Sequence, residues 1–145
     1  MISQAAGAAN VQNMRPLLIE GYASLFGLED LSGDIVCAGA FQRAVTRPDL
    51  PPMLLQHRMG AIVGCWTRMV QDGRGLYVRG LIKEESGKSF VRMKLDGLSI
   101  GFRPLMWRRR ACGGRELTDV ELVEVSLVAE PMQPAARFRV LNLVN

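Results

Sequence analysis

The chain contains one histidine, His57, in the stretch PPMLLQHRMGAIVGCW between two hydrophobic runs. An imidazole can act as a general base on a serine hydroxyl when the two groups lie within hydrogen-bond reach. Ser99 fits a nucleophile best, because in DGLSIGF it lies between Gly97 and Gly101, and glycines let backbone amides approach a substrate oxygen closely. The residue types therefore favour a His57–Ser99 pair. The alternative is a structural role for each residue, as a core histidine and an ordinary strand serine.

The cysteines predict neither a disulfide framework nor a metal site. Cys37, Cys65 and Cys112 are odd in number and widely spaced, and no C-x-x-C occurs. We expect no cofactor and no metal. A further hypothesis makes Cys65 or Cys112 the nucleophile with His57.

The composition is that of a soluble globular domain. The 145 residues are enough for one domain, with 48% hydrophobic and 22% charged residues. No apolar run reaches the ~18 residues of a membrane span, and MISQAAGAANVQNM lacks the pattern of a signal peptide. We expect no membrane partner and a flexible leader over residues 1–16.

The elements that must position these residues are mainly strands. The turn QDGRG between two β-rich runs predicts a hairpin, and the run after Arg115 predicts two extended pieces or one long bent strand. The final run RFRVLNLV predicts a short strand or a tail. Without regular βαβ alternation, we expect a mainly β fold, a mostly antiparallel barrel or sandwich, with a few flanking α-helices. The expected strands cover residues 17–26, 53–57, 61–70, 76–82, 98–107 and 115–130, and the expected helices cover 37–47 and 83–97.

Much of the net charge of +4 comes from WRRRACGGR, residues 107–115. Such a cluster can meet nucleic acid or an acidic protein. Because no aromatic interleaving or nucleic-acid motif accompanies it, a solvated hairpin tip is favoured and a nucleic-acid partner is not expected.

Several motifs together resemble one family. In chain order they are GYASLFG, DLSGDIVCAGAF, LLQH, IVGCW, QDGRGLYVRGLI, LSIGF and VEVSLVAEPMQPAA. This series resembles the prohead maturation proteases of tailed phages, serine proteases that share a fold with the herpesvirus capsid maturation protease, assemblin. The resemblance covers residues 19–136 and implies an assemblin-like antiparallel β-barrel. We divide the chain into a leader (1–16), a prohead protease domain (17–136) and a C-terminal strand or tail (137–145).

The resemblance implies that His57 is the general base and Ser99 the nucleophile. Assemblin-type enzymes use a second histidine as third member, and this chain has none, so an acidic residue serves or the pair acts as a dyad. Glu124 is the best candidate, because strand alternation separates it and Ser126 from the valines of VEVSLV. The alternative is a solvent-facing strand glutamate. The other acidic candidates are Asp119 and Glu121, whereas Asp72 fits turn chemistry.

The same resemblance implies a serine endopeptidase that cleaves the capsid or scaffold precursor of a phage, prophage or gene transfer agent. Its expected partners are the major capsid protein precursor with its scaffolding segment, and other copies of itself. Its expected place is the immature procapsid in the bacterial cytoplasm. Self-cleavage is expected before Arg15 or after Ala136. Arg103 is a candidate for the oxyanion site. The competing hypothesis is a catalytically inactive capsid- or scaffold-binding β-barrel module that binds through Arg108 to Arg115.

Overall fold

The computed structural model describes residues 16–86 and 93–142. Most of this chain is strand, and the helix predicted over 37–47 is the short α2 (Gln42–Thr46). Part of the helix predicted over 83–97, residues 87–92, lies outside the described residues, and Gly97 is the first residue of β6 rather than the end of a helix. Within the described ranges no helix is long and apolar enough to cross a membrane. The strands are β1 (Leu17–Leu25), β2 (Ile35–Val36), β3 (Met53–Leu55), β4 (Ile62–Gln71), β5 (Gly75–Ile82), β6 (Gly97–Arg109), β7 (Arg115–Val128) and β8 (Phe138–Val140).

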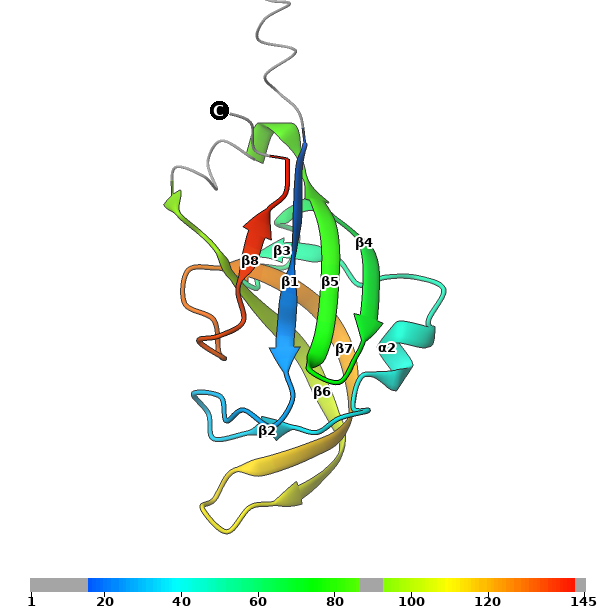
Figure 1. Ribbon diagram of the computed structural model, residues 1–145, viewed down its shortest axis with the longest axis vertical. Coiled ribbons are helices and arrows are strands. Elements are labelled where there is room, and N and C mark those ends of the chain that lie inside the picture. Colours follow the sequence, from blue (N-terminus) through cyan, green and yellow to red (C-terminus); the bar gives the residue numbers. More distant parts are fainter. Residues whose placement is uncertain (1–15, 87–92, 143–145) are drawn as a thin grey trace, which may run out of the picture.

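The strands form one curved eight-stranded sheet, in the order β2-β7-β3-β4-β5-β1-β8, with β6 also paired to β7 (Figure 1). The prediction of a mainly β fold with few helices is confirmed. Two features differ from an antiparallel barrel. β2 and β3 run parallel to β7, and no continuous ladder closes the sheet. A single bridge between Gly97 and Arg137 spans the gap between β6 and the start of β8.

The long β6–β7 hairpin carries several of the predicted site residues, including Ser99 and Glu124. β6 is one continuous strand, although its register with β7 shifts after Gly101 and around Pro104 to Trp107. β7 is likewise one strand, 14 residues long. The Cys-Gly-Gly segment forms the predicted tip, where the Arg110 N–H donates to the Gly114 carbonyl at 2.7 Å. Figure 1 shows this tip extending beyond the rest of the sheet.

The core lies inside the curved sheet, and α2 packs against β4 and β7. It is built from inward-facing aliphatic side chains that include Ile19, Val78, Leu98, Leu122 and Leu127, each no more than 1% exposed. Alternating strand positions bury one face of each strand and so fix its register. The register of β6 against β7 decides which polar side chains meet.

β8 joins the sheet beside β1, so the last predicted segment is a strand. Glu20 on β1 accepts hydrogen bonds from Tyr77, Arg79 and Arg139, which lie on β5 and β8. The bonds from Tyr77, Arg139 and Arg79 lower the pKa of Glu20 to about 2. This carboxylate therefore ties three neighbouring strands together.

An ion pair joins the loop between β1 and β2 to the start of β7. Asp34 is 5% exposed, and its carboxylate accepts hydrogen bonds from Arg115 Nε at 3.1 Å and Nη2 at 2.7 Å. The Arg115 backbone N–H donates to the same carboxylate at 3.2 Å. The Arg115 hydrogen bonds hold the pKa of Asp34 below its usual value, although burial acts in the opposite direction.

Asp34→Asn should lower the free energy of unfolding by about 2 kcal/mol at pH 7, because Arg115 loses its carboxylate partner. The effect is smaller than for a fully buried pair, since the Arg115 side chain is 34% exposed. A lowered folded-state pKa stabilises the fold above the unfolded value of about 3.9, and this contribution fades as pH falls further. Urea titrations of wild type and variant should therefore differ less at pH 3 than at pH 7. Asp49→Asn, at an exposed aspartate, is the control, and a pH-independent difference for Asp34→Asn would contradict the assignment.

Candidate active site

His57 lies in a tight turn that directly follows β3. The Arg58 N–H donates to the Leu55 carbonyl at 3.0 Å, and the two central residues, Gln56 and His57, have φ of 51° and 60°. Turns with positive φ at both central positions normally select glycine and asparagine. Left-handed backbone at two residues with full side chains costs about 1 kcal/mol or more each. Such strain persists only where the surroundings hold it, and it is commonest at functional sites.

β7 supplies the contacts that hold this turn. The Gln56 N–H donates to the Leu127 carbonyl at 3.0 Å, and the Gln56 side-chain oxygen accepts from the Ala129 N–H at 3.3 Å. The His57 N–H donates to Ser126 Oγ at 3.1 Å. The parallel pairing of β3 with β7 brings these groups together.

Glu124 is buried on β7 and bonded to the imidazole. Its side chain is 7% exposed, and Oε1 pairs with His57 Nδ1. The alternative of a solvent-facing strand glutamate is therefore wrong. With Glu124 ionised, Nδ1 carries the proton and donates, which leaves Nε2 as an acceptor for a second group.

The pKa of His57 is raised above its ordinary value. The Glu124 hydrogen bond is the largest cause, and burial, which lowers the pKa, offsets only part of it. The carboxylate favours the imidazolium, the species that forms when the ring accepts a proton.

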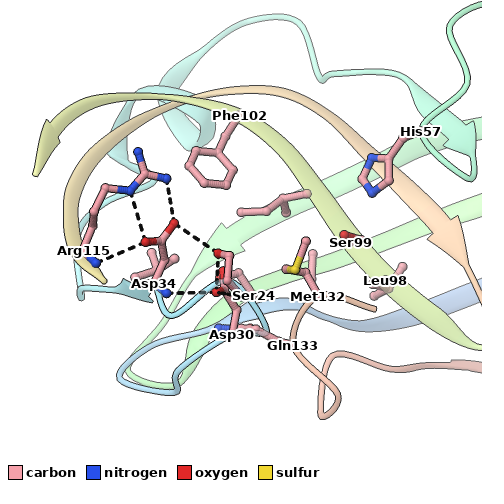
Figure 2. Close-up of a pocket in the computed structure, with 14 residues that line it drawn as sticks. Ser24, Asp30, Asp34, His57, Leu98, Ser99, Phe102, Arg115, Met132 and Gln133 are labelled. Carbon is pink, nitrogen blue, oxygen red and sulfur yellow. Dashed lines mark hydrogen bonds and ion pairs between the residues drawn. The ribbon is translucent and has the colours of Figure 1, made fainter. Parts of the chain in front are cut away.

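Ser99 and His57 line the same cavity, of about 170 Å³. Ser99 is on β6, directly opposite Ser126 on β7. Ser99 is 5% exposed and reaches the cavity, whereas Ser126 is fully buried and is not among the lining residues. Figure 2 shows His57 and Ser99 at one end of this cavity and the Asp34–Arg115 pair at the other. The nonpolar residues that line the cavity are Ala23, Val36, Leu98, Ile100, Phe102 and Met132.

Gly101 makes room for the Glu124 carboxylate. The two residues are directly opposite in the β6–β7 ladder, and a Cβ added at Gly101 would lie 2.2 Å from Glu124 Oε1. The sequence suggested a different reason, namely close backbone approach to substrate. The structure assigns this glycine to the carboxylate beside His57.

The other predicted candidates lie elsewhere. Asp119 pairs with Arg43 at 3.0 Å, and Glu121 lies 3.8 Å from Arg103 on the exposed face. Arg103 is not among the described residues that line the cavity. Asp72 caps its own turn by accepting from the Arg74 and Gly75 N–H groups, as predicted.

Neither Cys65 nor Cys112 is among the described residues that line the cavity, and both side chains are exposed. Among the residues that the structure describes, no three or more His, Cys, Asp or Glu side chains form a cluster that could hold a metal ion. At one end of the cavity (Figure 2) lie the Ser99 hydroxyl and the His57 imidazole, which is bonded to the buried Glu124 carboxylate.

Sequence reasoning missed two features of the site. Alternation placed Ser126 on the same strand face as Glu124, but nothing in the sequence assigned Ser126 a role. The polar end of the cavity, with Asp34 and Arg115, had no sequence signal, because these residues are 81 positions apart.

Comparison with known proteins gives both sequence and fold relatives. The prohead protease of Enterobacteria phage HK97 is 36% identical over 93 residues, which cover 59% of this chain and 41% of the relative. The fold resembles that of a KSHV protease, solved with a hexapeptide phosphonate inhibitor (TM-score 0.64, 13% identity, 89% of this chain and 66% of that one). It also resembles a varicella-zoster virus protease (TM-score 0.56, 13% identity, 88% of this chain and 65% of that one).

The chain spans less than two thirds of the length of each of these relatives. The two herpesvirus structures support the expected assemblin-like fold, and the phage relative supports the family resemblance seen in the motifs. Residues 6–143 match the family described as Caudovirus prohead serine protease, and this chain belongs to that family.

Proposed function

We propose that this chain is a serine endopeptidase in which Ser99 is the nucleophile, His57 the general base and Glu124 the third member. The observation that carries the proposal is the buried Glu124 carboxylate paired with His57 Nδ1, beside a cavity that His57 and Ser99 share. Within a prohead protease family, this arrangement supports peptide hydrolysis through an acyl-enzyme.

The reaction proceeds in two halves. Ser99 Oγ attacks the peptide carbonyl carbon while its proton passes to His57 Nε2, and the ionised Glu124 stabilises the imidazolium. The C–N bond then breaks, the proton passes to the leaving amine, and an acyl-serine remains. Water attacks this ester with His57 again as base, which releases the acid and restores the Ser99 hydroxyl.

We further propose that the substrate is the capsid or scaffold precursor of the same particle, cleaved inside the immature procapsid in the bacterial cytoplasm, together with the enzyme's own termini. The family supports this substrate class. The inactive-module hypothesis relied on the arginine cluster. Three arginines of this cluster form ion pairs within the chain, namely Arg108 with Glu116, Arg110 with Glu29 and Arg115 with Asp34. Most of the positive charge of the cluster is therefore paired with carboxylates of the same chain.

Ser99→Ala should abolish cleavage of the co-expressed capsid precursor, because the attacking oxygen is gone. The rate should fall at least about 10³-fold. Intact mass spectrometry of enzyme and precursor measures it, and a fluorophosphonate probe should label wild type at Ser99 only. Ser86→Ala, at a serine outside the cavity, is the control. Undiminished cleavage by Ser99→Ala would rule out the proposed nucleophile.

The pH dependence follows from the raised pKa of His57. The base acts in its neutral form, so activity should rise with pH through a midpoint above the ordinary imidazole value of about 6.5. Glu124→Gln should move the midpoint down to that value or below and reduce the plateau rate about 10²-fold or more, because the imidazolium loses its counter-charge. Since the chain has one histidine, NMR titration of Ser99→Ala reports the His57 pKa without assignment. An unchanged pKa in Ser99→Ala/Glu124→Gln would contradict the pairing.

Gly101→Ala tests the space that the carboxylate needs. The new methyl group would overlap Glu124 Oε1, so Glu124 must turn away from His57. We expect a loss of activity close to that of Glu124→Gln and the same fall in the His57 pKa. Gly73→Ala is the matched control, because a Cβ there meets nothing within 4 Å. Equal activity in the two alanine variants would show that Gly101 has no such role.

A further inference from the structure

Ser126 is a buried hydroxyl at the centre of the site that the proposed reaction does not use. It lies on β7 opposite Ser99 and is 0% exposed. A fully buried hydroxyl needs hydrogen-bond partners, because burial removes its hydrogen bonds to water and an unpaired group destabilises the fold. Its partners therefore indicate what it does.

Both partners belong to the His57 assembly. Ser126 Oγ donates to Glu124 Oε2 and accepts from the His57 backbone N–H at 3.1 Å. One hydroxyl can do both, because it has one proton and two lone pairs. The two carboxylate oxygens are thus divided, with Oε1 on the imidazole and Oε2 on the serine.

This pattern fixes two degrees of freedom at once. The hydrogen bond to Oε2 opposes rotation of the carboxylate away from Nδ1. The bond from the His57 N–H helps to hold the left-handed backbone that aims the ring at the cavity. Displacements of about 1 Å in a catalytic group can reduce rates about 10²-fold.

We propose that Ser126 is a positioning residue that couples the Glu124 carboxylate to the His57 turn. The inference rests on the proposed function, in which Glu124 and His57 act on Ser99. Ser126 itself is not the nucleophile, because it is closed off from the cavity and its proton is committed to Glu124.

The first experiment compares Ser126→Ala and Ser126→Thr with wild type in cleavage of the capsid precursor. Ser126→Ala should lower kcat about 10- to 100-fold with little change in KM, and Ser126→Thr, which keeps the hydroxyl, should restore most of it. Thr118→Val is the control, because it removes a β7 hydroxyl whose hydrogen bond within the described residues goes to the Met106 carbonyl at 3.1 Å, away from His57 and Glu124. Ser126→Cys keeps a side chain of similar size but has only a weak donor, so its kcat should resemble that of Ser126→Ala. This variant serves as the test if the Ser126→Ala protein does not fold.

A double-mutant cycle with Glu124→Gln tests the route of the effect. If Ser126 acts through Glu124, then Ser126→Ala should reduce kcat less than about threefold further in the Glu124→Gln background. Additive losses, or a Ser126→Ala enzyme equal to Thr118→Val, would overturn the proposal. A fluorophosphonate label mapped to Ser126 would also overturn it.

An NMR measurement on inactive protein tests the role of Ser126 independently of whether the chain is a protease. In Ser99→Ala protein, the one imidazole gives one set of NMR signals. Adding Ser126→Ala should move the His57 pKa toward its ordinary value and speed exchange of the Nδ1 proton, whereas adding Thr118→Val should change neither. An unaltered imidazole overturns the positioning role even if the enzyme is active. An altered one supports it even if wild type cleaves nothing in solution.

Discussion

The buried Glu124 carboxylate is the constraint on which the rest of this site depends. Taking a carboxylate out of water costs several kcal/mol unless hydrogen bonds replace the lost hydration. Here His57 and Ser126 supply them, and Gly101 leaves the space. The buried carboxylate therefore keeps its space and its hydrogen-bond partners only in the observed register of β6 against β7. A shift by one residue would put a side chain where Gly101 lies and turn Ser99 to the other face.

β7 is the strand through which the fold meets that constraint. It pairs with β2, β3 and β6, so one continuous strand reaches the cavity loop, the His57 turn and Ser99. Its parallel pairing with β3 ends where the left-handed turn begins. At the other end of the strand, Arg115 anchors Asp34 and thus the loop that forms the polar end of the cavity.

The sequence predicted the residue types of the site better than their arrangement. The lone histidine, the glycine-flanked serine and the glutamate among valines were the residues whose type and position suggested a role beyond packing, and local departures of this kind are expected at functional sites. β1, β4, β5 and the hairpin tip followed from runs of β-forming residues and from turn residues. The parallel pairing of β2 and of β3 with β7 could not be predicted in this way. It joins segments that are far apart in the chain, and contacts between distant segments leave no local sequence pattern. The purpose of Gly101 was also hidden, since only the β6–β7 register reveals which side chain lies over it.

The energetics bear on why this buried polar network is present. A half-satisfied polar network is less stable than a nonpolar core, and replacing a complete buried network by apolar residues of similar volume is often neutral or stabilising. The left-handed backbone at Gln56 and His57 adds further strain. Stability alone therefore does not explain the network, whereas orientation of the imidazole for the proposed reaction would. Variants that remove its members should lose activity more readily than they lose the fold, which is the usual relation between a strained site and the scaffold that supports it.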